Sequence, residues 1–179
     1  MLARITKLAA AMIAAAAVVF ALAVPAAQTR GGPKCFGKPA TIVKGNGNDN
    51  IKGTSANDVI IAGDGQNNID GKGGNDRICG GGDGDDIFGG TGNDKMASGA
   101  STDFIAGRQG NDLHIAGAGE DQIDAVQDAT NDDEDRAIGK KGNDFIDVGD
   151  GEDNDIAVGG RGNFDECPAD GGDTVDCEI

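Results

Sequence analysis

The chain has 179 residues, enough for about one domain, and combines 32 glycines with 31 acidic and 15 basic residues for a formal net charge of −16. Aromatic residues make up only 3%, with no Trp or Tyr, so a conventional globular core is excluded and the composition by itself is typical of disorder. The negative charge disfavours nucleic acid and anionic membranes as partners and makes small cations the natural counter-charge.

The first segment predicts export. Residues 1–27 read as a secretory signal peptide, with a basic start, an apolar run over 8–24 and small residues before a cut near Ala26 or Ala27. A membrane anchor is the alternative, but the run is short and Ala-rich, and no second apolar span follows. We therefore expect a secreted, extracellular protein without a membrane span in the mature chain, and a lead-in or cap over 28–44.

A nine-residue period organises residues 45–124. Stepping by nine gives eight aspartates and one asparagine, and the position two residues after each of them is isoleucine in seven of nine cases. The acidic positions are Asp49, Asp58, Asn67, Asp76, Asp85, Asp94, Asp103, Asp112 and Asp121. The apolar positions are Ile51, Ile60, Ile69, Ile78, Ile87, Met96, Ile105, His114 and Ile123. Two registers kept together for nine units indicate a repeat protein.

Each unit predicts a glycine-containing turn, then the acidic residue, then a short strand with one buried side chain. Glycine recurs two residues before the acidic position, where it permits a positive φ and a close approach of the backbone. Isoleucine favours a strand, and its neighbours point to the other side. Two units contain two turns and two strands, so they close one coil. The predicted architecture is a stack of short parallel strands with turns along both edges.

Apolar burial alone does not hold such a coil together. One buried Ile contributes about 1.5–3 kcal/mol, whereas ordering the nine residues of a unit costs several times as much. Stacked acidic turns add repulsion, so a bound ligand must contribute to the folding free energy. Carboxylate and carbonyl oxygens suit Ca²⁺, and Mg²⁺ fits less well because it retains its waters and demands a tighter octahedron.

The period weakens at several points. Asn67 places a neutral amide in an acidic position, and Asp83 takes a glycine position, so the register there could shift by one. Residues 125–134 read as an acidic insertion loop in which Asp128, Asp132, Asp133 and Glu134 are solvated.

Degenerate repeats then cover 135–165, and 166–179 form a C-terminal cap. Counting by nine resumes at Asp135, Asp144 and Asp153, which puts Ala137, Ile146 and Asp155 in the apolar position. Phe164 stands where an aspartate is expected.

The four cysteines lie in the exported part, where disulfides persist. Three pairings are possible. Cys167 with Cys177 closes a short local loop and is preferred, which leaves Cys35 with Cys79. The cysteine spacings do not resemble a zinc site.

The units GGTGNDKMA (89–97) and GKGGNDRIC (71–79) resemble the hemolysin-type calcium-binding nonapeptide, G-G-x-G-x-D-x-U-x with U apolar, also called the repeats-in-toxin (RTX) motif. The lead-in CFGKPATIVKGNGNDNIKGT and the tail GGDTVDC are similar to those of small secreted actinobacterial proteins of this type. The resemblance implies an all-β fold, a right-handed parallel β-roll (β-solenoid) with several Ca²⁺ ions between turns two units apart on the same edge.

In that family the sixth position supplies a carboxylate and the first four supply carbonyls. One edge would hold Asp49, Asn67, Asp85, Asp103 and Asp121, and the other Asp58, Asp76, Asp94 and Asp112. Asp144 and Asp153 would be ligands in the degenerate repeats. The carbonyl ligands carried over are those of Gly45, Gly47, Gly63, Gly65, Gly71, Gly74, Gly89, Gly90 and Gly92.

The preferred function is a secreted calcium-binding protein that folds on binding Ca²⁺ and has no catalytic activity. His114 is the only histidine, but it occupies an apolar position between Leu113 and Ile115, so we expect an interior residue without a catalytic role. The alternative is a structural or adhesive cell-surface protein that calcium stiffens. The sequence does not identify a protein or cell-surface partner.

Overall fold

The structure is a computed structural model that describes residues 32–126, 133–149, 154–162, 164–169 and 171–177. The predicted signal peptide, residues 1–27, lies outside these ranges. Within them every regular element is a β-strand. No helix of the described residues is long and apolar enough to cross a membrane.

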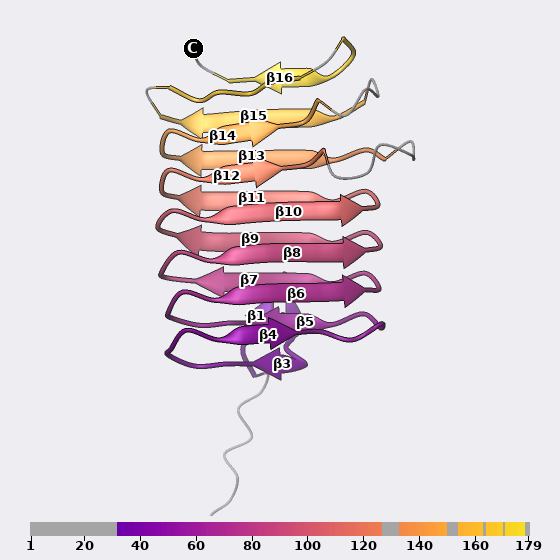
Figure 1. Cartoon of the computed structure of the whole chain (residues 1–179), viewed down its shortest axis with the longest axis vertical. Helices are drawn as coiled ribbons and strands as arrows, with labels where there is room; N and C mark the ends of the chain where they lie inside the picture. Colours follow the sequence, from indigo (N-terminus) through magenta and orange to yellow (C-terminus); the bar gives the residue numbers. More distant parts are fainter. Residues whose placement is uncertain (1–31, 127–132, 150–153, 163, 170, 178–179) are drawn as a thin grey trace, which may run out of the picture. The chain divides into compact units, whose positions relative to one another are not determined.

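The repeats form two parallel sheets whose strands alternate along the chain, so that two units close one coil of a solenoid with about seven turns. In Figure 1 the arrows of β6, β8 and β10 run one way and those of β7, β9 and β11 run the other. The six-stranded sheet contains β4 (Asn50–Lys52), β6 (Asn68–Gly73), β8 (Asp86–Thr91), β10 (Phe104–Gln109), β12 (Gln122–Asp124) and β14 (Phe145–Asp147). The eight-stranded sheet contains β3 (Ile42–Val43), β5 (Val59–Ile61), β7 (Arg77–Gly81), β9 (Lys95–Ala100), β11 (Leu113–Ala118), β13 (Arg136–Lys141), β15 (Ile156–Arg161) and β16 (Thr174–Asp176). The predicted parallel solenoid is confirmed.

One apolar side chain per unit fills the space between the two sheets. The predicted positions from Ile51 to Ile123 are all buried, and the flanking residues point outward because side chains alternate along a strand. The next inward position is small, as at Ala62, Gly71 and Ser98. The core is therefore a single file of mostly isoleucine side chains, flanked on each edge by the acidic positions.

The register holds through the regular repeats. Ile69 pairs with Ile87, and Ile87 pairs with Ile105, each 18 residues further on. The shift considered at Asp83 does not occur, because its Oδ2 takes part in the stack by accepting a hydrogen bond from the amide of Gly65 at 2.9 Å.

The coils lengthen after β12 without losing the stack. The backbone amide of Asp112 donates to Asp135, 23 residues on, and that of Asp135 donates to Asp155, 20 residues on. Counting by nine is therefore wrong here: Asp155 occupies the acidic position rather than the apolar one, and Ala157 fills the core. Asp153 lies outside the described residues.

Two further expectations near the insertion are corrected. Asp165, not Phe164, occupies the acidic position of its coil: Asp165 is buried and Phe164 is 71% exposed. Asp133 is not a solvated loop residue, because it is buried and its Oδ2 accepts a hydrogen bond from the amide of Gly110 at 3.0 Å. Residues 127–132, the centre of the predicted acidic loop, lie outside the described residues.

Both preferred disulfides are present. Cys35 of β1 (Lys34–Cys35), which pairs antiparallel with β2 (Lys38–Pro39), is bonded to Cys79 of β7. This bond ties the lead-in to the third strand of the eight-stranded sheet. Cys167 is bonded to Cys177 and closes the C-terminal segment.

Candidate metal centre

The acidic residues stack in two columns, and each column lies along the edge where the strands of one sheet begin. In both columns the Oδ1 atom of each residue after the first accepts a hydrogen bond from the backbone amide of its counterpart one coil earlier, with N···O distances of 2.7–3.2 Å. The first column contains Asp49, Asn67, Asp85, Asp103, Asp121, Asp144 and Asp165. The second contains Asp58, Asp76, Asp94, Asp112, Asp135, Asp155 and Asp173. One carboxylate oxygen thus holds the coils in register.

The other carboxylate oxygen, Oδ2, is buried without a hydrogen-bond partner in much of both columns. Among the described residues this holds for Asp76, Asp85, Asp94, Asp103, Asp112, Asp121, Asp144 and Asp165. A buried acceptor without a partner costs about 1–3 kcal/mol, and more when it is charged. The same cost recurs coil after coil, which indicates that these oxygens are arranged for a ligand.

Backbone oxygens approach the same places. A Cβ built on Gly71 would lie 2.5 Å from Oδ2 of Asp76 and would also meet the carbonyl oxygen of Gly89 in the next coil. In the turns, a Cβ on Gly92 would lie 2.5 Å from the carbonyl oxygen of Gly74. Gly92 has a φ of 115°, as predicted for this position. Carboxylate and carbonyl oxygens therefore converge where only glycine fits, and they form a donor set suited to Ca²⁺.

The electrostatics favour a cation as well. Burial, with repulsion from neighbouring aspartates, raises the pKa of Asp76 to about 7 and that of Asp112 to about 9. Burial also raises the pKa of Asp94 and of Asp85 to about 6, and that of Asp121 to about 7. Burial and mutual repulsion destabilise the ionised form of the stacked carboxylates, and a divalent cation bound between them would stabilise that form again.

Three predicted site residues differ from this pattern. Oδ2 of Asp58 already accepts hydrogen bonds from the backbone amide and the hydroxyl of Thr54, at 2.7 and 2.9 Å. Asn67 donates through Nδ2 to the carbonyl oxygen of Gly65 at 2.7 Å and to Oδ1 of Asp85 at 3.0 Å, so its amide makes two hydrogen bonds that a carboxylate could not make. Asp49, in the first coil, is only partly buried and lies 3.9 Å from Nζ of Lys44.

Counting by nine misses Asp155, Asp165 and Asp173, which all occupy acidic positions of the columns, and the ligands carried over from the resemblance do not include Asp135. The sequence pattern that identifies these residues is an aspartate followed two positions later by a small or apolar residue. Ala137 follows Asp135 in this way, and Cys167, two residues after Asp165, packs against the core. A small residue such as Ala137 or Ala157 therefore marks the inward position as well as isoleucine does.

The fold and the two columns define a class of protein: a parallel β-solenoid whose stacked turns present oxygen donors to cations. Comparison with known proteins narrows this class. The family model of the RTX calcium-binding nonapeptide repeat (4 copies) matches residues 45–78, 80–113 and 130–163, which is more than half of the chain. The chain belongs to this calcium-binding repeat family. No curated protein and no solved structure matches it.

Proposed function

We propose that the protein is secreted, folds when Ca²⁺ ions bind between its stacked turns, and works as a calcium-dependent scaffold without catalysis of its own. The observation that carries this proposal is the repeated buried Oδ2 atom without a partner, beside carbonyl oxygens of the adjoining coil. The proposed ligands are the carboxylates of both columns, including Asp135, Asp155 and Asp165, together with carbonyls of the turn glycines.

Folding on calcium follows from the same arrangement. Without a cation, each coil must bury carboxylates that repel one another against a core of one isoleucine per unit. With the cation, the binding free energy becomes folding free energy, because the unfolded chain does not hold the ligands together. The sequence of events is therefore binding coupled to coil formation rather than binding to a preformed cage.

Export is supported by the disulfides, which persist in oxidising compartments. Weak sites, with Kd on the order of 0.1–1 mM, match extracellular calcium modules. The absence of catalysis is supported by the recurrence of the acidic residues: each coil carries the same carboxylates, so their arrangement belongs to the architecture and singles out no reactive pair.

The experiment is a far-UV circular dichroism titration of the protein recovered from the culture medium. We expect little β-structure in chelator and a cooperative gain as Ca²⁺ rises through about 0.1–10 mM. Mg²⁺ at the same concentrations is the matched control and should produce a smaller change. A spectrum that is already that of the folded state in chelator, or one that Ca²⁺ leaves unchanged, would contradict coupled folding. An N-terminus that begins before residue 20 would contradict the predicted cleavage.

A further inference from the structure

His114 is the one member of the described core file that carries ring nitrogens. It occupies the isoleucine position in strand β11 and is fully buried. Neither Nδ1 nor Nε2 has a hydrogen-bond partner of good geometry among the described residues, although the backbone of Arg136 lies close enough to oppose the lowering of the ring's pKa by burial. Leaving such a group unpaired costs about 1–3 kcal/mol, whereas isoleucine at the same position would cost nothing of this kind. A bound species that contacts the imidazole nitrogens would remove this cost.

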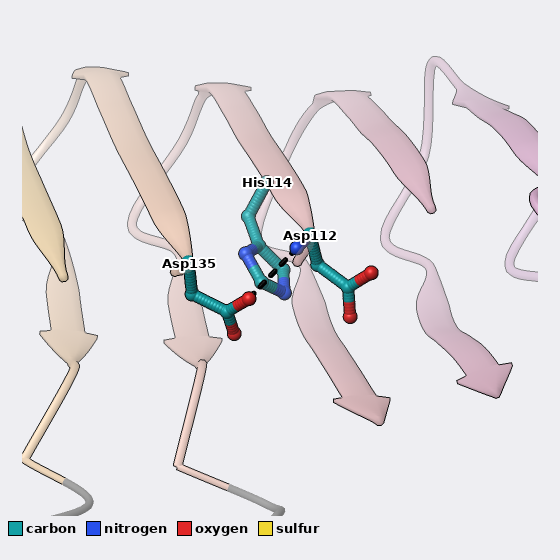
Figure 2. Close-up of side chains that lie close together, drawn as sticks. All are labelled: Asp112, His114 and Asp135. Atoms are coloured by element: carbon teal, nitrogen blue, oxygen red, sulfur yellow. Dashed lines mark hydrogen bonds between the residues drawn. The ribbon is translucent and has the colours of Figure 1, made fainter. Parts of the chain in front are cut away.

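The ring is aimed at two carboxylates. Figure 2 shows His114 between Asp112 and Asp135, whose side chains extend from neighbouring coils, with the hydrogen bond from the amide of Asp112 to Asp135 passing beside the ring. The three side chains each offer a ligand atom, and these atoms lie within 4.8 Å of one another. All three residues are buried.

A regular coil shows what has changed. A Cβ built on Gly71 would meet Oδ2 of Asp76 and, at 3.2 Å, the terminal methyl Cδ1 of Ile78. A Cβ built on Gly107 would likewise meet Oδ2 of Asp112, but there the second neighbour is Nε2 of His114, at 2.6 Å. The imidazole nitrogen thus points to the place beside the carboxylate that a hydrocarbon group occupies elsewhere.

The neighbouring coils leave room for the ring. His114 pairs with Met96 on one side and with Ala137 on the other. Ala137 is small where a regular unit has isoleucine. The larger ring and the smaller neighbour occur together in adjacent coils, which allows the imidazole to sit in the file without displacing the stack.

We propose that Asp112, His114 and Asp135 bind one divalent transition-metal ion, of which Zn²⁺ is the best fit, in place of the Ca²⁺ ion that these two carboxylates would otherwise hold, in a site that differs from the calcium sites by its nitrogen ligand. Imidazole with carboxylates suits zinc and its neighbours in the periodic table, whereas Ca²⁺ prefers oxygen alone. Two carboxylates and a neutral imidazole also balance the charge of a divalent ion, which matters in a dry interior. Zinc ligands at about 2.0–2.2 Å from the ion lie about 3–4 Å apart, so ligand atoms separated by as much as 4.8 Å would move about 1 Å closer together on binding.

The test compares the wild type with His114→Ile, which installs the residue that most units carry at this position. Both proteins are saturated with Ca²⁺, titrated with Zn²⁺, and their bound metals are counted by mass spectrometry of the dialysed samples. We expect one more Zn²⁺ per chain in the wild type than in the variant, and a loss of zinc affinity in the variant of at least about tenfold. Removing a residue that only hydrogen-bonds to a metal ligand already lowers metal affinity by about 10–100-fold, so removing a ligand should cost no less. Circular dichroism in Ca²⁺ should show both proteins folded.

A second pair of variants separates this site from weak binding by acidic turns. Asp135→Asn should lower zinc affinity, and Asp76→Asn, at the same column position beside Ile78, should leave it unchanged. Co²⁺ in the wild type should give the intense visible absorption of a low-coordinate nitrogen-containing site. Equal zinc binding by the wild type and His114→Ile, or equal effects of the two aspartate variants, would overturn the proposal. Either result would leave the calcium titration unaffected, so this inference and the calcium function fail separately.

Discussion

Replacing a carboxylate by an amide in the columns should stabilise the metal-free protein and destabilise the calcium-bound protein. The reverse replacement should have the opposite effect under each condition. The two substitutions are Asp94→Asn, in the second column, and its reverse, Asn67→Asp, in the first. The natural Asn67 shows what an amide does there: its Oδ1 still accepts from the amide of Asp49 at 3.0 Å, while Nδ2 donates to the carbonyl of Gly65 and to Oδ1 of Asp85. The hydrogen bond that holds the register is kept, and the change falls on the atom that we propose faces the metal.

Without calcium, Asp94→Asn removes a buried charge. Burial raises the pKa of Asp94 from 3.8 to about 6, and about two pKa units correspond to about 3 kcal/mol. Allowing for screening by the solvent that reaches the turn, we expect a gain of about 1–3 kcal/mol at neutral pH. Asn67→Asp should lose a similar amount, because it adds a charge beside Asp85 and removes the hydrogen bonds that Nδ2 donates to Gly65 and to Asp85.

With calcium, the signs reverse. A site with Kd of 0.1–1 mM contributes about 1.4–2.7 kcal/mol at about 10 mM free Ca²⁺. Asp94 lies between Asp76 and Asp112 in its column, so its replacement weakens the site on each side. Asp94→Asn should therefore destabilise the calcium-bound protein by about 1.4–2.7 kcal/mol for each site lost, and Asn67→Asp should stabilise it.

The assay is urea unfolding in Ca²⁺ and osmolyte-induced folding in chelator, both followed by circular dichroism. The osmolyte makes a weakly folded metal-free state measurable because it strengthens effective burial. If Asp94→Asn shifts stability in the same direction under both conditions, or if the two substitutions act alike, the assignment of Oδ2 as the metal-facing atom is refuted.

Three further predictions concern pH, the core and a disulfide. Burial raises the pKa values of five carboxylates to about 6–9 in the folded state, above the unfolded value of 3.8; they are Asp76, Asp85, Asp94, Asp112 and Asp121. The folded state therefore binds more protons, and the stability of the metal-free protein is lost as the pH rises through about 6–9. Lowering the pH from about 8 to about 5 in chelator should increase β-structure, and no increase would contradict the burial of these carboxylates. Ile105→Ala should cost about 2–5 kcal/mol in calcium-bound urea unfolding because Ile105 is fully buried, whereas Val43→Ala, at a site that is 51% exposed, should change stability by less than about 0.5 kcal/mol. Replacing Cys35 and Cys79 by serine should cost up to about 4 kcal/mol, since the bond closes a loop with a sequence separation of 44; an unchanged melting temperature in Ca²⁺ would show that the lead-in adds nothing to the solenoid.

Most of the fold could be predicted from a local sequence pattern. Asp and Ile two residues apart, repeated every nine residues, were enough to predict the stacked coils, the buried file and the two acidic columns through Asp121. The reason is that each coil contacts mainly its neighbours, so a regular repeat in sequence becomes a regular repeat in space. Both preferred cysteine pairs were also correct.

The tertiary structure decided what the period could not. Once coils lengthen to 23, 20 and 21 residues, counting by nine misplaces the acidic position, whereas the stacking of backbone hydrogen bonds returns each coil to register and selects Asp155 and Asp165. Stacking also brings Asp135 beside His114 and Asp112 across an insertion, and no spacing rule within one unit contains that contact. The sequence by itself determined which side chains face the core and the turns, because that depends on alternation along a strand. Which atoms meet between coils depends on the length of chain that each coil must accommodate before it pairs with the next.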